Sequence, residues 1–148
     1  MFEWRYHLNY FSGKKTEYSF NYIGRLLRIN TPDPLNDQER DEAYYMAEIE
    51  IKNRWNPFFE TFFAVSTGIN YQVYIRATNS INNFSQRNLK YEPGFRIKIK
   101  KFDWKSIYGL IATYHVKDFN SESGKNRSSR SFITDQQLRF SATKFNEW

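Results

Sequence analysis

The sequence predicts an all-β fold with one or two short helices. Phe, Tyr and Trp make up 20% of the 148 residues, and Tyr and Phe favour strands. Apolar and polar residues alternate over several stretches, as they do along strands with one buried face. Polar segments rich in turn-forming residues separate these stretches. The chain has the length of one domain, 1–148, and is long enough to bury a core.

The alternation predicts the strands in chain order. The first stretch, 2–10, ends at a turn formed by Ser12–Lys15, and the second contains Gly24, which suggests a bulge or a bend. In the third, Ala47, Ile49 and Ile51 face one way and charged residues face the other. The predicted strands are 2–10, 17–29, 45–53, 69–78, 95–100, 107–119 and 131–145, the last of which could be one strand or two.

The segments between these strands differ in character. Residues 30–43 are polar, contain two prolines and predict a loop. Residues 56–68 fit either a short helix, with Asn56 as N-cap, or a strand, because they are aromatic and β-branched. Residues 79–92 allow a short helix, and residues 120–130 predict a flexible basic loop.

At least five strands, a short helix before a basic strand and long polar loops fit a five-stranded barrel of the oligonucleotide-binding (OB) type. In that arrangement residues 1–17 form an N-terminal strand or hairpin extension. A jelly roll or a β-sandwich is the alternative.

A row of cations is the first sign of function. The net charge is +6, which favours an anionic partner. In "EPGFRIKIKKFDW" (92–104) the alternation turns Phe95, Ile97 and Ile99 into the barrel and directs cations outward, namely Arg96, Lys98 and Lys100. Cations that follow phosphates and aromatic rings that stack on unpaired bases are the two devices of single-strand binding. The alternative is a sheet edge protected by solvated lysines.

Aromatic residues stand beside cations elsewhere in the chain. Trp55 follows Arg54 in a basic connection, Tyr74 shares an outward face with Arg76, and the loop at 120–130 carries three more cations. The candidate nucleic-acid-binding residues are Lys52, Arg54, Trp55, Phe59, Tyr74, Arg76, Arg96, Lys98, Lys100, Trp104, Lys105, Lys125, Arg127 and Arg130.

Three segments in order resemble the bacterial and phage single-stranded DNA-binding protein family. They are "NYIGRLLRINTPDP", "NLKYEPGFRIKIKKF" and "RSFITDQQLRFSATKF", which are similar to that family's opening strand, its strand after the helix and its closing strand. The resemblance implies an OB fold, sequence-independent binding of single-stranded DNA in replication or recombination, a stacking role for Trp55, and a homo-oligomer. About twenty residues precede the first motif, and the family's acidic C-terminal tip is missing from this sequence.

The sequence also allows function classes other than single-strand binding. Pro32-Asp33 and Glu50-x-Lys52 spell a PD-(D/E)xK pattern, in which carboxylates hold Mg²⁺ for a nuclease. An aromatic-rich structural or assembly protein, or an anti-defence protein of a virus, is a further alternative.

We expect no catalysis, no cofactor and no metal, and a partner that is single-stranded DNA or, alternatively, RNA. The sequence has no cysteine, no signal peptide and no long apolar run, so we expect the protein in the cytoplasm and without membrane contact. If the protein comes from a virus or a phage, we expect it in the cytoplasm of the host.

Overall fold

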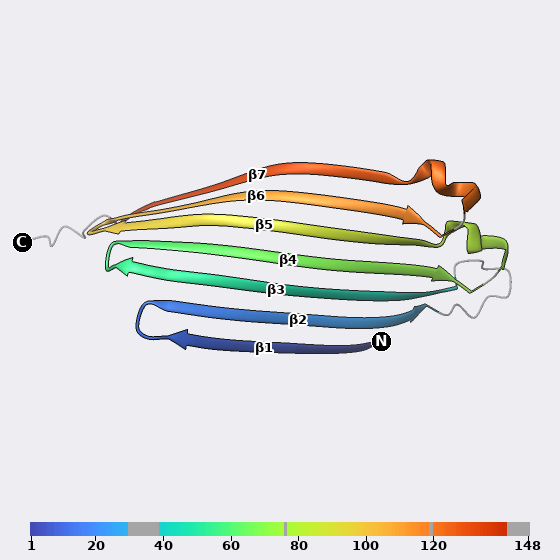
Figure 1. Ribbon diagram of the computed structural model, residues 1–148, viewed down its shortest axis with the longest axis horizontal. Coiled ribbons are helices and arrows are strands. Elements are labelled where there is room, and N and C mark those ends of the chain that lie inside the picture. Colours follow the sequence, from blue (N-terminus) through green and yellow to red (C-terminus); the bar gives the residue numbers. More distant parts are fainter. Residues whose placement is uncertain (30–38, 76, 119, 142–148) are drawn as a thin grey trace, which may run out of the picture.

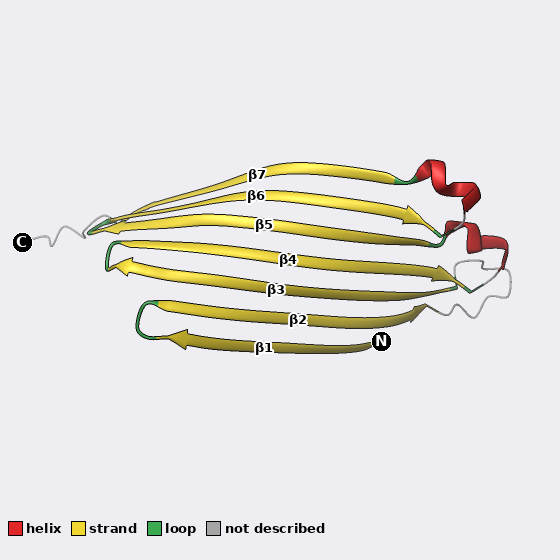
Figure 2. Cartoon of the chain, in the orientation of Figure 1, coloured by secondary structure: helices red, strands yellow, loops and turns green. Residues whose placement is uncertain are grey.

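The computed structural model describes residues 1–29, 39–75, 77–118 and 120–141, and it forms one seven-stranded antiparallel sheet (Figure 1). The strands lie in the sheet in the order in which they occur in the chain. Two short 3-10 helices, η1 and η2, lie between strands, so the all-β class is confirmed (Figure 2). The elements are β1 (Phe2–Ser12), β2 (Thr16–Ile29), β3 (Arg40–Asn56), β4 (Phe59–Tyr74), η1 (Ala77–Asn82), β5 (Phe84–Ile99), β6 (Phe102–Lys117), η2 (Asn120–Lys125) and β7 (Arg127–Phe140).

The five-stranded OB barrel is not confirmed, because the sheet is open and has seven strands. Residues 1–17 extend the sheet itself, since β1 pairs with β2 along its whole length. The ambiguous segment 56–68 is a strand after a tight turn, in which the Asn56 side chain accepts a hydrogen bond from the Phe58 N–H at 2.8 Å. Residues 79–92 are helical only up to Asn82, and the expected loop 120–130 consists of η2 and the start of β7.

The two ends of the sheet are built differently. Residues 13–15, 57–58 and 100–101 connect the strands at one end, which we call the turn end. Residues 30–39, 75–83 and 118–126 connect them at the other, which we call the connection end. The turn end is at the left in Figure 1. Gly13 and Lys100 adopt positive φ in their turns, at 67° and 50°, so two of these three tight reversals use a left-handed residue.

Gly24 is a packing feature and not a bulge. It stays in regular register between Trp4 on β1 and Tyr45 on β3. A Cβ atom at this position would overlap the Trp4 indole ring, so the ring lies directly over the glycine. An aromatic ring that covers a glycine in a neighbouring strand shields its backbone, and the sequence therefore needs glycine here.

A single sheet layer leaves no enclosed core. Within the described residues, no hydrophobic side chain is fully buried. Large apolar side chains such as Leu8 and Phe132 remain 66% and 64% exposed. Stable domains bury such residues against a second layer, so this sheet needs something to cover it.

Candidate functional site

The strand register divides the side chains between two chemically different faces. Residues paired across an antiparallel ladder point to the same side, and successive residues in a strand point to opposite sides. Starting from Phe2, one face carries the even-numbered residues of β1, β2, β6 and β7 and the odd-numbered residues of β3, β4 and β5. We call this the apolar face and the opposite one the polar face.

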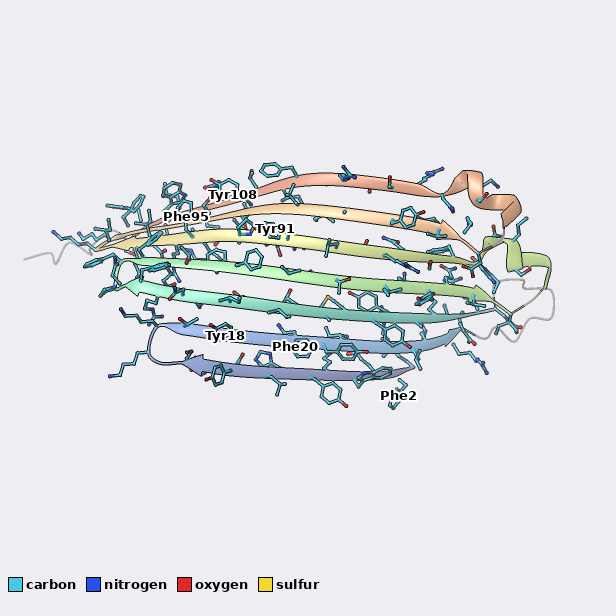
Figure 3. All side chains as sticks on the ribbon, viewed as in Figure 1. Phe2, Tyr18, Phe20, Tyr91, Phe95 and Tyr108 are labelled. Atoms are coloured by element: carbon cyan, nitrogen blue, oxygen red, sulfur yellow. The ribbon has the colours of Figure 1, made fainter. Side chains whose placement is uncertain are left out.

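An unbroken apolar row crosses the apolar face from one sheet edge to the other. Each member is the direct ladder partner of the next, and the row runs through Leu8, Phe20, Ile49, Val65, Tyr91, Leu110 and Phe132. Figure 3 labels Phe20 and Tyr91 of this row, together with Phe2, Tyr18, Phe95 and Tyr108 of the same face. The apolar surface therefore extends over the whole width of the sheet.

The apolar residues of this face form a band that runs obliquely to the strands. On β1 the band covers Phe2 to Tyr10, and on β7 it covers Phe132 to Phe140. Because Phe132 lies in the row of Leu8 and not in that of Phe2, the band shifts by six residues between the edges. That is about 20 Å along the strands over about 29 Å of sheet width, so the strands are tilted by about 35° from the perpendicular to the band. Measured at right angles to its length, the band is about 22 Å high.

In the described strands, every charged residue of the apolar face lies outside this band. They follow its margin toward the connection end and are Arg28, Asp41, Arg87 and Arg130. Arg28 donates two hydrogen bonds to the Asp41 carboxylate, at 2.9 and 3.0 Å. These hydrogen bonds hold the pKa of Asp41 below its usual value, so both partners stay charged at neutral pH. A sharp border thus separates apolar from ionised groups.

A polar side chain inside the band has its partners within the sheet. Gln136 on β7 donates to the Ser106 hydroxyl at 2.6 Å and accepts a hydrogen bond from the Trp104 indole N–H at 3.0 Å. The amide therefore satisfies two neighbouring polar groups without water. Such internal satisfaction is what a polar group needs in apolar surroundings.

Four of the predicted nucleic-acid-binding residues meet at the turn end. Backbone hydrogen bonds join the hairpin tips there, from Arg54 N–H to the Lys15 carbonyl at 2.7 Å and from Lys98 N–H to the Phe58 carbonyl at 2.8 Å. Between the tips lies a hollow of about 530 Å³, which we call the basic hollow. It is lined by Lys15, Arg54, Trp55, Asn56, Pro57, Phe58, Glu60, Arg96 and Lys98.

Part of the positive charge in the basic hollow is neutralised. The Arg54 guanidinium pairs with Glu60 at 2.8 Å, and that of Arg96 makes two hydrogen bonds to Asp103 at 2.7 and 2.5 Å. Lys98 forms no ion pair within the described part of the chain. The Trp55 indole donates to the Thr61 hydroxyl at 2.9 Å and is 57% exposed. The hollow therefore offers an accessible ring and a free ammonium group.

The predicted stacking and phosphate-binding groups are otherwise divided between the faces. The alternation expected at Phe95–Ile99 is confirmed, since Phe95 pairs with Ser106 of the apolar face and Arg96 with Lys105 of the polar face. Phe59 and Trp104, however, lie on the apolar face, opposite to those cations. A strand of nucleic acid on the polar face could not stack on either ring.

The remaining candidate residues are dispersed. Lys52, Tyr74, Lys105 and Arg127 belong to the polar face, and Arg130 belongs to the apolar face. The Lys105 ammonium lies 5.2 Å from the centre of the Phe62 ring. Lys100 does not continue the outward row, because it lies in the β5–β6 turn, and Lys125 ends η2. Arg76 lies outside the described residues.

The nuclease pattern is not assembled in the described part of the chain. Glu50 and Lys52 lie side by side on the polar face of β3, whereas Pro32 and Asp33 lie outside the described residues. A search of the described residues finds no group of three acidic, histidine or cysteine side chains arranged to hold a metal ion.

The apolar band is the feature that sequence reasoning missed. Its signal is present in the sequence, because the alternation of 2–10 is repeated in every later strand. Each tight turn sets the register of one hairpin, so the turn at 13–15 pairs Leu8 with Phe20 and the turn at 57–58 pairs Ile49 with Val65. Expecting a closed barrel, whose apolar strand faces point inward, hid the possibility that such faces point outward.

None of the helices in the described residues is long and apolar enough to cross a membrane. No family model, no curated protein and no solved structure matches the chain.

Proposed function

We propose that this protein spans a lipid bilayer with its strands, with the apolar band against the acyl chains and the polar face toward water. The observation that carries the proposal is the oblique apolar band. Strands that cross hydrocarbon present about nine to eleven residues to it and are tilted by about 35–45°. The stretch from Phe2 to Tyr10 and the angle of about 35° fit both values.

The margins of the band support the same proposal. Ionised side chains such as Arg87 and Arg130 begin where the band ends, toward the connection end. Tyr10 and Tyr18 face each other at its margin toward the turn end, with ring centres 6.0 Å apart. Tyrosine is enriched at the level of lipid headgroups, because its ring is apolar and its hydroxyl is polar.

The size of the band makes exposure to water costly. Its projected area is about 750 Å², whereas soluble monomers rarely expose apolar patches larger than a few hundred Å². Lipid tails would cover this area without a second protein layer. In hydrocarbon the outer edges of β1 and β7 also need hydrogen-bond partners, so the sheet would continue through further strands at both edges.

Neighbouring residues of similar chemistry on opposite faces allow a direct test. The sequence contains no cysteine, so single substitutions Leu110→Cys and Ile111→Cys can each carry one environment-sensitive fluorophore. The full chain is reconstituted into vesicles containing a lipid with a quencher on its acyl chain. We expect strong quenching at position 110 and little at 111, with the reverse order for a water-soluble quencher.

Two results would refute the proposal. Equal quenching at both positions would show that the faces meet the same medium. Shielding of position 110 in a lipid-free dimer, with no association with vesicles, would show that a second copy covers the band. Phe132→Cys and Ile133→Cys provide an independent pair on β7.

Binding of single-stranded DNA is the second candidate function. The meeting of Arg54, Trp55, Arg96 and Lys98 in the basic hollow favours it. Titration with oligo-dT should then quench tryptophan fluorescence, with an affinity that falls steeply as salt rises. Equal or tighter binding of duplex DNA, or no binding at low salt, would exclude it.

A further inference from the structure

The turns at the turn end carry lysines and no acidic residue. Lys14 and Lys15 lie in the β1–β2 turn, and Lys100 and Lys101 form the β5–β6 turn. Lys14, Lys15 and Lys100 form no ion pair within the residues that the structure describes. The third turn supplies exposed Phe58, 57% accessible, beside Trp55. Cations and aromatic rings therefore share one end of the sheet.

The opposite end has a different charge character. There, Arg28 is neutralised by its two hydrogen bonds to Asp41. The sequence between β2 and β3 is also acidic, with Asp33, Asp37 and Glu39. The connection end also carries cations, among them Lys117, Arg127 and Arg130, so its charges are mixed. A negatively charged surface would therefore attract the turn end more strongly.

We infer that the turn end binds the headgroups of anionic phospholipids, an inference that rests on the proposed function. The turns lie just beyond the band, at the level where headgroup phosphates lie when acyl chains cover the band. Each lysine ammonium offers three hydrogen-bond donors to a phosphate, and clusters of lysines bind anionic lipids. Trp55 and Phe58 reach the same level, where aromatic rings anchor membrane proteins.

The basic hollow gives this binding a local reporter. Replacing Trp4, Trp104 and Trp148 by phenylalanine leaves Trp55 as the single tryptophan. Its quenching by phosphatidylglycerol with brominated acyl chains is compared with quenching by brominated phosphatidylcholine at the same mole fraction. We expect phosphatidylglycerol to be favoured roughly fivefold or more, the effect of one lysine near an anionic surface.

Matched variants separate local binding from net charge. In Lys14→Gln/Lys15→Gln/Lys100→Gln the preference should fall to about one. The control Lys117→Gln/Arg127→Gln/Arg130→Gln removes the same number of cations at the connection end and should keep the preference. A preference unchanged in the triple variant, or lost equally in the control, would overturn the inference.

The remaining outcomes distinguish the inference from the proposal beneath it. Equal quenching by both brominated lipids would overturn only the headgroup binding. Quenching by neither would refute the membrane proposal as well. Loss of the preference on adding millimolar inorganic phosphate at constant ionic strength would assign the site to free phosphate. Quenching of Trp55 by oligo-dT without lipid would assign it to nucleic acid.

Discussion

Replacing Ile49 by arginine would place a guanidinium group near the middle of the apolar band on β3. The band is centred on Tyr6 on β1 and shifts by about one residue per strand, so on β3 its middle lies in the row of Leu8, which contains Ile49. An arginine at the bilayer midplane costs about 2–4 kcal/mol, and the cost falls to about 0–1 kcal/mol near the interface. We therefore expect Ile49→Arg to destabilise the protein by about 3 kcal/mol, roughly a hundredfold in the folded-to-unfolded ratio.

The measurement is reversible unfolding of the full chain in lipid vesicles by denaturant. Leu110→Arg, at the margin of the band toward the connection end, should cost about 1 kcal/mol or less. Ile111→Arg adds the same group on the polar face and should cost little, because the guanidinium reaches water. The order of the three free energies of unfolding is the prediction.

An apolar face in contact with water gives the opposite result. Ile49 is 53% exposed in the isolated sheet, so an arginine there would remain hydrated and cost almost nothing. A neutral Ile49→Arg variant, or a larger loss in Ile111→Arg, would refute the reasoning from the band.

Two further predictions concern single positions. Gly24→Ala should force the Trp4 ring off its neighbouring strand and cost about 1–3 kcal/mol of unfolding free energy, with a shifted tryptophan emission. Gly124→Ala, where an added methyl group meets no atom within 4 Å, is the control, and an equal loss there would contradict the packing account. Asp41→Asn should lower stability at neutral pH, because the pKa of Asp41 is lowered by its hydrogen bonds to Arg28. The stability contributed by this ion pair is fully present above the usual aspartate pKa and disappears as pH falls through the lowered pKa of Asp41. The unfolding free energies of variant and parent should therefore converge in acid, and a difference that stays constant with pH would disprove the account.

The sequence predicted the strands far better than the way they assemble. The alternation at 45–53 and 95–99 and the turn at Ser12–Lys15 all follow from local chemistry, and the register confirms them. The OB barrel is not confirmed, and the sequence could not distinguish it from an open sheet, because an apolar strand face looks the same in sequence whether it points into a barrel or out of a sheet. Nothing local in the sequence states what covers the face.

The residues of the candidate site could be predicted one by one, but their arrangement in space could not. Arg54, Trp55, Arg96 and Lys98 were chosen separately, and hairpin contacts between distant parts of the chain bring them together. Trp104 and Lys105 were predicted for one binding surface, but these adjacent residues lie on opposite faces of the sheet. Adjacent residues in a strand never share a face, so a tryptophan beside a lysine is poor evidence for one binding surface.

The order of the strands has a consequence for how such a sheet can change its size. Each strand bonds only to its neighbours in the chain, and each tight turn closes one two-stranded unit. Inserting or deleting one such unit would leave every other ladder, the two faces and the positions of the turns unchanged. Width can therefore grow or shrink in steps of one hairpin, by duplication of a short stretch of gene, without a new design for the rest of the molecule.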